Sequence, residues 1–279
     1  MATQSTKEKL VDSTVSKALV VLQAVADHVK TTHKGISLRE LAKTTKFNIS
    51  TVYRYLACLE SYGLIRQNSV DGMYELGFKV VELSNIFLEA QDLRKIALPI
   101  MEELCQVTKE TIYLGILEGL EVAYLERVNS PLPIRPHTQI GGRNELYCTG
   151  LGKAILAFAP EKLMEEVIRR GLRHHTPNTI IDVEQLRREI AKTRARGYSI
   201  DDMENEEQVR CAGAPIYDNT GRVIGALSIS GPAFRISLER ITSDLGEKVK
   251  GAAVRISEQL GYLPNLTSLT PLAGAASKA

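Results

Sequence analysis

Residues 37–76 carry the stretch that decides the fold of the first part of the chain: SLRELAKTTKFNISTVYRYLACLESYGLIRQNSVDGMYEL. Ser37 and Glu40 have the spacing of a capping box, so we expect a short helix to start there and to end at the run TTKF. A second helix, capped by Asn48 or Ser50, is indicated by apolar residues at three- and four-residue intervals. These residues are expected on one buried stripe and are Ile49, Val52, Leu56 and Leu59.

Two strand-like runs, at residues 64–67 and 73–76, follow the second helix, and Asp71-Gly72 between them supports a turn. Helix, turn, helix and hairpin in this order predict a winged helix-turn-helix, whose expected partner is double-stranded DNA. Two alternatives stay open. The second helix can be an ordinary surface helix of a small helical subdomain, and the hairpin can pack only on its own domain.

The residues expected to contact DNA are polar or basic and lie around the second helix and the hairpin. Hydroxyls near a helix start suit phosphate contacts, and the guanidinium of Arg54 can grip guanine O6 and N7. The full set is Lys17, Arg39, Lys46, Ser50, Thr51, Tyr53, Arg54, Arg66 and Gln67. Residues 1–77 hold ten Lys or Arg against seven Asp or Glu, a balance of +3, so the cations have to gather on one face to attract nucleic acid.

The composition indicates a globular chain rather than a membrane or secreted protein. The 279 residues are 24% charged and 44% hydrophobic, and no apolar run is long enough to cross a bilayer. The polar first residues do not form a secretory signal, so a cytoplasmic location is predicted. The four cysteines lie more than forty residues apart, a spacing that predicts neither a disulfide nor a metal site, and no cofactor is expected.

The rest of the chain shows an α+β pattern. A linker helix at 78–89 and an amphipathic helix at 93–107 precede a strand hairpin at 111–117 and 121–128. A further strand is expected at 132–140, on an edge because of its prolines. Helices then follow at about 150–158, 160–170 and 182–196, strands at 209–217 and 222–230, and a closing helix at 237–260.

These elements predict an order of domains along the chain. A winged helix-turn-helix occupies residues 1–77 and a linker helix 78–91. A sensor domain with flanking helices and a central antiparallel sheet occupies 92–263, and the tail 264–279 is expected to be disordered.

By its motifs the chain resembles the IclR family of bacterial transcription regulators. The first half contributes SKAL (16–19), LRELA (38–42) and STVYRYL (50–56). The second half contributes GLGKAILA (150–157), RGYSIDD (196–202), RCAGAPI (210–216) and ALSISGP (226–232). The resemblance implies a GAF-like effector-binding domain, a homodimer that is often a homotetramer, and control of transcription by a small metabolite.

The same resemblance implies where the effector binds. The family's effector positions correspond here to Gly150, Leu151, Asp201, Cys211, Ser228 and Ser230. Amides at a helix start together with two hydroxyls can satisfy a carboxylate, so we expect a small organic acid. Ile134, Leu146 and Leu151 are expected to form the apolar wall that selects the size of the effector.

The expected function is a sequence-specific DNA-binding regulator, with repression as the expected sign and a pseudopalindromic operator read by paired domains. The alternative is a GAF-like metabolite sensor that acts through protein partners. Cys211, Asp201 and His137 are candidates for a thiol enzyme site, and His137, Cys148 and Asp201 for a metal set. No sequence motif activates the thiol or supports the metal set, so neither an enzyme nor a metal site is expected.

Overall fold

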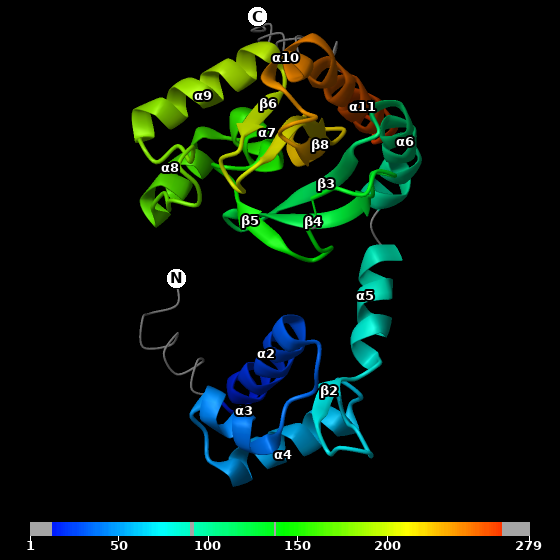
Figure 1. Ribbon diagram of the computed structural model, residues 1–279, viewed down its shortest axis with the longest axis vertical. Coiled ribbons are helices and arrows are strands. Elements are labelled where there is room, and N and C mark those ends of the chain that lie inside the picture. Colours follow the sequence, from blue (N-terminus) through cyan, green and yellow to red (C-terminus); the bar gives the residue numbers. More distant parts are fainter. Residues whose placement is uncertain (1–12, 90–91, 137, 264–279) are drawn as a thin grey trace, which may run out of the picture. The chain divides into compact units, whose positions relative to one another are not determined.

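The computed structural model describes residues 13–89, 92–136 and 138–263 (Figure 1). The predicted disordered tail at 264–279 and His137 lie outside these ranges. The chain divides into two compact units, Met1–Ala90 and Gln91–Ala279. Each unit has its own core and is described by itself.

The first unit contains the predicted helix-turn-helix and hairpin. The Ser37 hydroxyl accepts a hydrogen bond from the Glu40 amide at 3.2 Å, which confirms the predicted helix start. Asn48 occupies the cap position of the next helix, although its side chain makes no capping hydrogen bond. The elements are α2 (Thr14–Thr32), α3 (Leu38–Thr45), α4 (Ile49–Ser61), β1 (Ile65–Gln67), β2 (Tyr74–Leu76) and α5 (Lys79–Glu89).

The core of the first unit lies between α2, α3, α4 and the hairpin. Val52, Leu56 and Leu59 are buried in it as predicted, and Tyr55 joins them. Ile49 does not: it is the first residue of α4, three positions before the first buried residue, Val52, and it is 51% exposed. The prediction that Ile49 belongs to the buried stripe is therefore wrong.

The second unit is built on a six-stranded antiparallel sheet. Its strand order is β5-β4-β3-β8-β7-β6, so β5 and β6 are the edges. The predicted hairpins β3/β4 and β7/β8 are both confirmed. The strands are β3 (Thr111–Glu118), β4 (Glu121–Val128), β5 (Arg143–Glu145), β6 (Ser199–Asp202), β7 (Val209–Tyr217) and β8 (Val223–Pro232).

Helices cover both faces of this sheet. On one face α7 packs against β7 and β8, and α8 and α9 pack against α7 (Figure 1). On the other face α6 and α11 pack against each other and against the sheet. The helices are α6 (Asp92–Thr108), α7 (Gly150–Phe158), α8 (Glu161–Arg170), α9 (Val183–Arg196), α10 (Leu238–Arg240), the π-helical turn η1 (Ile241–Leu245) and α11 (Gly246–Gln259).

One predicted strand is absent. Residues 132–136 and 138–140 form bends and irregular backbone rather than a strand. The physical reason is the run of prolines at 131, 133 and 136, which removes the amide donors that a ladder needs. The short strand β5 instead takes the edge beside β4.

Candidate functional site

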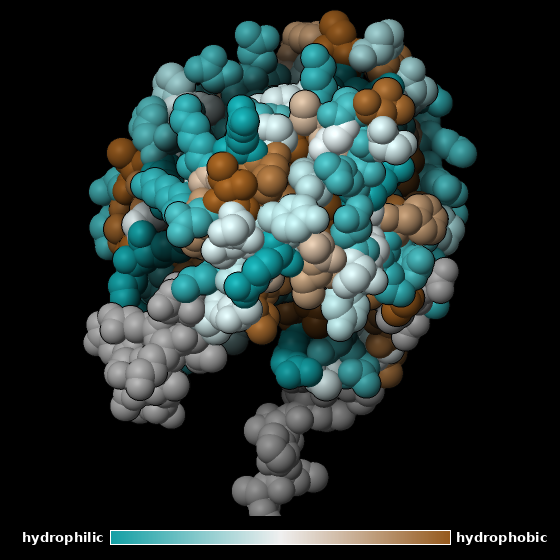
Figure 2. All heavy atoms as spheres, turned by 90° about the horizontal axis from the view of Figure 1, so that it is seen from below, coloured by the Kyte–Doolittle hydropathy of each residue, from teal (hydrophilic) through white to brown (hydrophobic). Residues whose placement is uncertain are grey.

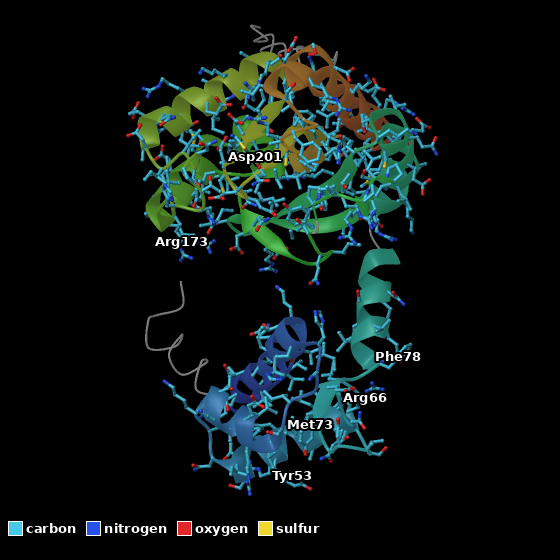
Figure 3. All side chains as sticks on the ribbon, viewed as in Figure 1. Tyr53, Arg66, Met73, Phe78, Arg173 and Asp201 are labelled. Carbon is cyan, nitrogen blue, oxygen red and sulfur yellow. The ribbon has the colours of Figure 1, made fainter. Side chains whose placement is uncertain are left out.

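Helix α4 presents a polar face to solvent. Ser50 and Arg54 are exposed, Thr51 is half-buried and Tyr53 is 57% exposed. Tyr53 is labelled in Figure 3. Among the described residues Arg54 has no ion-pair partner. Its exposed guanidinium is therefore available for a contact with another molecule. Figure 2, which views the structure from below, shows a surface of mainly hydrophilic and neutral residues with separate hydrophobic patches.

The remaining basic residues of the first unit differ in how far they are engaged. Arg39 and Lys46 are exposed and Lys17 is half-buried. Arg66 on the hairpin forms an ion pair with Glu75 at 2.7 Å. The side-chain amide of Gln67 donates to the Gly72 carbonyl at 2.9 Å. Arg66 and Gln67, the two hairpin residues predicted to contact DNA, are thus already bonded to other residues of the hairpin.

In the second unit, six of the eight predicted effector residues line one cavity. They are Gly150, Leu151, Asp201, Cys211, Ser228 and Ser230, brought together from α7, β6, β7 and β8. The two others lie elsewhere: Ile134 is 62% exposed, and Leu146 is fully buried in the core under α7. Their predicted role as the apolar wall is not supported by this geometry.

The cavity also has walls that the sequence interpretation did not name. Tyr113 lies opposite Ser228 in the β3/β8 register, a long-range pairing that no local pattern reveals. The Tyr113 hydroxyl donates to the Pro136 carbonyl and accepts from the Thr138 amide, each at 3.1 Å, and so fastens the irregular segment over the cavity. The additional lining residues are Tyr113, Tyr124, Pro136, Thr138, Thr149, Asn205, Glu206 and Val209.

The start of α7 contributes backbone donors to this cavity. Thr149 caps the helix by accepting from the Gly152 amide at 3.0 Å. The amides of Gly150 and Leu151 belong to the first turn and have no intrahelical partner. Gly150 approaches β7 so closely that a Cβ there would lie 2.9 Å from Cys211 Cβ, so a residue without a side chain is required.

Asp201, labelled in Figure 3, is a buried carboxyl of the cavity lining. It is only 3% exposed. Burial raises the pKa of its carboxyl to about 7, although Lys153 acts in the opposite direction. Its Oδ1 atom accepts from the Glu204 amide at 2.8 Å. Asp201 thus changes charge near neutral pH.

Cys211 is a buried thiol rather than an activated nucleophile. Burial, followed by the nearby carboxyl of Asp201, raises the pKa of its thiol well above the usual value. A protonated thiol in this position is a weak hydrogen-bonding wall group and not a reactive thiolate. Within the described residues, no three His, Cys, Asp or Glu side chains are arranged to hold a metal ion.

The cavity is small, at about 20 Å³. Such a volume holds roughly one water molecule. An organic acid therefore fits only if the walls move, and the segment held by Tyr113 is the irregular part of those walls. Behind the cavity, Lys153 and Glu204 form a buried ion pair.

Two family models match the chain. Residues 14–69 match the IclR helix-turn-helix domain, and residues 86–258 match the bacterial transcriptional regulator IclR C-terminal domain. No helix in the described part of the chain has both the length and the apolar character to cross a membrane.

Individual relatives agree with these matches. The chain is 34% identical over 251 residues to the HTH-type transcriptional regulator KdgR of Escherichia coli, covering 90% of this chain and 93% of that protein. It is 31% identical to the HTH-type transcriptional repressor AllR of Klebsiella pneumoniae, covering 86% and 89%. A crystal structure of an IclR homologue from Microbacterium hydrocarbonoxydans complexed with 4-hydroxybenzoate is similar, with a TM-score of 0.76, 27% identity and 89% and 99% coverage.

Proposed function

Because the chain belongs to the IclR family of bacterial transcription regulators, with a helix-turn-helix DNA-binding domain and an effector-binding domain, we propose how its two units divide the work. The first unit reads an operator through α4, and the second binds a small organic acid in the cavity at the start of α7. The observation that carries the proposal is the gathering of six effector positions around that cavity.

The proposed DNA contact rests on the exposed polar face of α4. Arg54 is uncommitted and lies beside the hydroxyls of Ser50 and Thr51, which suits base and phosphate contacts in the major groove. The match to the IclR helix-turn-helix domain does not favour the alternative of a sensor that acts only through protein partners.

We propose a dimer as the DNA-bound species. Val15 and Leu19 on α2 and Val81 and Ile86 on α5 are large apolar side chains left exposed in the single chain. Covering them with a second copy would remove apolar surface from water and pair two recognition helices. The operator is then a pseudopalindrome with half-sites spaced by ~34 Å or a multiple of it. Pairing of dimers into a tetramer belongs to the same proposal.

The proposed effector is an acid because the cavity offers donors to an anion. The Gly150 and Leu151 amides and the hydroxyls of Ser228 and Ser230 can hold a carboxylate, whereas protonated Asp201 can donate to a second oxygen. The similar structure that contains 4-hydroxybenzoate supports this class of ligand. Binding opens the cavity walls and changes the arrangement of the paired DNA-binding units through α5, which we propose to be the linker helix.

Repression is the proposed sign, supported by the similar repressor AllR, and the cytoplasm is the proposed location because the DNA target lies there. A gel-shift assay on the DNA upstream of the protein's own gene tests the first unit, with random DNA as competitor. Calorimetry with benzoate, 4-hydroxybenzoate, pyruvate, lactate and gluconate tests the second, with 4-hydroxybenzamide as the neutral counterpart. Equal competition by random DNA would overturn the proposal of specific DNA binding. Heat from 4-hydroxybenzamide with none from the acids would overturn the proposal of an acid effector.

A further inference from the structure

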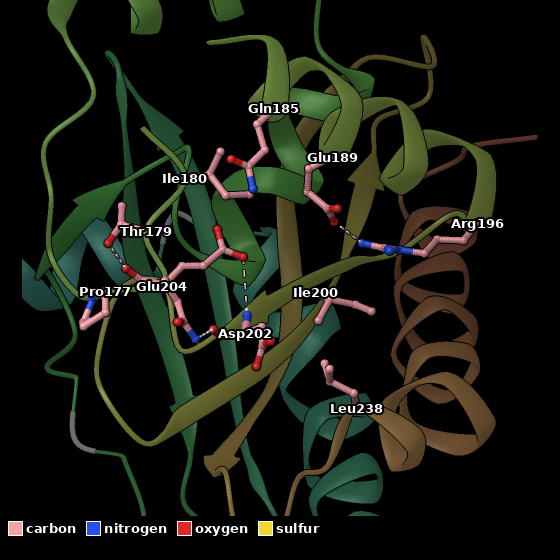
Figure 4. A pocket seen from close by; sticks show the side chains of 11 residues that line it. Pro177, Thr179, Ile180, Gln185, Glu189, Arg196, Ile200, Asp202, Glu204 and Leu238 are labelled. Atoms are coloured by element: carbon pink, nitrogen blue, oxygen red, sulfur yellow. Dashed lines mark hydrogen bonds and ion pairs between the residues drawn. The ribbon is translucent and has the colours of Figure 1, made fainter. Parts of the chain in front are cut away.

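A second hollow lies on the other side of the strand that carries Asp201. We call it the β6 groove; its volume is about 510 Å³, within the range of small-molecule sites (Figure 4). Alternation along the edge strand β6 separates the two hollows, because Asp201 lines the effector cavity whereas Ile200 and Asp202 line the groove. The groove is lined by Pro177, Asn178, Thr179, Ile180, Gln185, Glu189, Arg196, Ile200, Asp202, Glu204 and Leu238.

One lining group points to a ligand. Glu204 is only 4% exposed, and its Oε1 atom is held by Lys153. Its Oε2 atom is buried and has no hydrogen-bond partner among the residues that the structure describes. Figure 4 shows this carboxylate directed into the groove, toward the side formed by Ile180 and Gln185. A buried acceptor without a donor is unfavourable, so a ligand that donates a hydrogen bond to Oε2 would be favoured at this site.

The charges around the groove call for a positive ligand. Glu189 pairs with Arg196 and Asp202 pairs with Arg210, each at 2.6 Å, and Glu204 pairs with Lys153. Asp201 adds a fourth carboxyl beside these pairs, with its Oδ1 bonded to the Glu204 amide. The four carboxyls exceed the three cations by one negative charge once Asp201 has lost its proton; while Asp201 is protonated the charges balance, and the unpartnered Oε2 of Glu204 is then the group that favours a cation.

The same geometry favours an organic cation over a metal ion. A divalent cation needs several oxygen ligands, whereas the unpartnered buried oxygen found in the described part of the groove is Oε2 of Glu204 alone. Ile180, Ile200 and Leu238 supply an apolar wall for a short hydrocarbon. We propose that the β6 groove binds a small organic amine, whose ammonium group donates to Glu204 Oε2 while its hydrocarbon packs against this wall.

Glu204 also joins the groove to the effector cavity. Its Oε1 holds Lys153, and its amide holds Asp201, a wall of that cavity. At pH 6, where the Asp201 carboxyl is mostly protonated, the positive charge of an ammonium group in the groove should strengthen the binding of an acid effector. This coupling rests on the proposed acid effector, whereas the amine site does not. By linkage, the acid should strengthen amine binding by the same factor.

The test is calorimetry on the full-length protein with n-butylamine and 1,4-diaminobutane, in the absence of acid and DNA. The neutral control ligand is n-butanol. We expect saturable binding of the amines and none of butanol. Replacement of Glu204 by Gln should weaken amine binding roughly tenfold or more, because the charge-assisted hydrogen bond is lost.

A second pair of variants guards against misfolding of Glu204→Gln, which leaves Lys153 buried. Gln185→Trp fills the groove from the exposed surface of α9, and Arg188→Trp adds the same bulk at an exposed position that does not line it. Amine binding should be lost in the first and kept in the second. Absence of amine binding to the unaltered chain, equal binding of butanol, or unchanged binding by Gln185→Trp would each overturn the site.

The coupling is measured separately, by titrating 4-hydroxybenzoate and gluconate with and without saturating 1,4-diaminobutane. We expect the affinity for a bound acid to rise by about fivefold. An unchanged acid affinity would overturn the coupling and leave the amine site standing. If no acid binds at all while the amines do, the acid proposal fails and the amine site is retained.

Discussion

The two units of the chain place their functional residues in opposite ways. In the first unit, residues 50–54 of one helix supply the outward face, and they are exposed or half-buried apart from Val52. In the second unit, the cavity draws residues from Tyr113 to Ser230, and α7 is buried from Gly150 to Ala157. A surface that meets a large partner can be formed by residues that are neighbours in the sequence. A cavity, in contrast, is formed by residues from strands that are far apart in the sequence.

This contrast predicts that substitutions of buried residues in the second unit chiefly lower its free energy of unfolding. Lys153→Met should be the most destabilising change, because it leaves Glu204 as a buried, unpaired carboxylate. We expect a loss of roughly 3–5 kcal/mol in the free energy of unfolding of this unit. Chemical denaturation followed by circular dichroism measures it.

The matched control for this change is Lys162→Met, which removes an exposed lysine that lies 3.8 Å from Glu166. Its cost should be about 0–1 kcal/mol. Equal costs for the two variants would show that the buried ion pair has no special weight in this unit.

In the first unit, the expected damage is to binding and not to stability. Arg54→Ala removes an exposed, uncommitted guanidinium and should weaken operator binding by roughly 1–3 kcal/mol if Arg54 reads a base. Arg66→Ala is the comparison, because Arg66 is already paired with Glu75 and should matter less. Fluorescence anisotropy at fixed salt measures both. An unchanged affinity of Arg54→Ala would remove this residue from the contact surface.

The contrast also explains what could be read from the sequence. The cap at Ser37 and the β1/β2 hairpin follow from neighbouring residues, and both were predicted. Ile49 was assigned to the core because periodicity alone does not show where the packing partners of a helix end.

In the second unit, neighbouring residues carried less information. The hairpins were predicted, but the place of Tyr113 depends on its pairing with Ser228, more than a hundred residues away. The cavity residues were named through a family resemblance and not from spacing. Ile134 lies exposed on the proline-rich irregular segment and does not line the cavity, and the partner of Lys153 is set only by the folded chain.

A pH titration distinguishes the two units further. Since burial raises the pKa of Asp201 to about 7, its carboxyl loses its proton as the pH rises through neutrality. The cavity then gains a negative charge beside the carboxylates of Glu204 and Glu206, opposed by the nearby cation Lys153, while burial keeps Cys211, Cys148 and Tyr124 neutral. Affinity for an acid effector should therefore fall roughly tenfold between pH 6 and pH 8.

Asp201→Asn fixes this position in a neutral form and should flatten the pH dependence of acid binding. Calorimetry with 4-hydroxybenzoate or whichever acid of the panel binds measures it. A slope that persists in Asp201→Asn would assign the titration to another group. DNA binding by the first unit should show no comparable step from Asp201, because this residue lies inside the second unit.

The smallest expected effect concerns one hydroxyl of the cavity. Ser228→Ala removes one proposed donor to the carboxylate and should weaken acid binding by about 1 kcal/mol, roughly fivefold. DNA binding without effector should stay unchanged, because Ser228 is buried in the second unit, 2% exposed. Ser243→Ala, an exposed serine of η1, is the control. If Ser228→Ala lost acid binding and DNA binding together, Ser228 would be required for folding. The functions of the two units would then not be separable at this position.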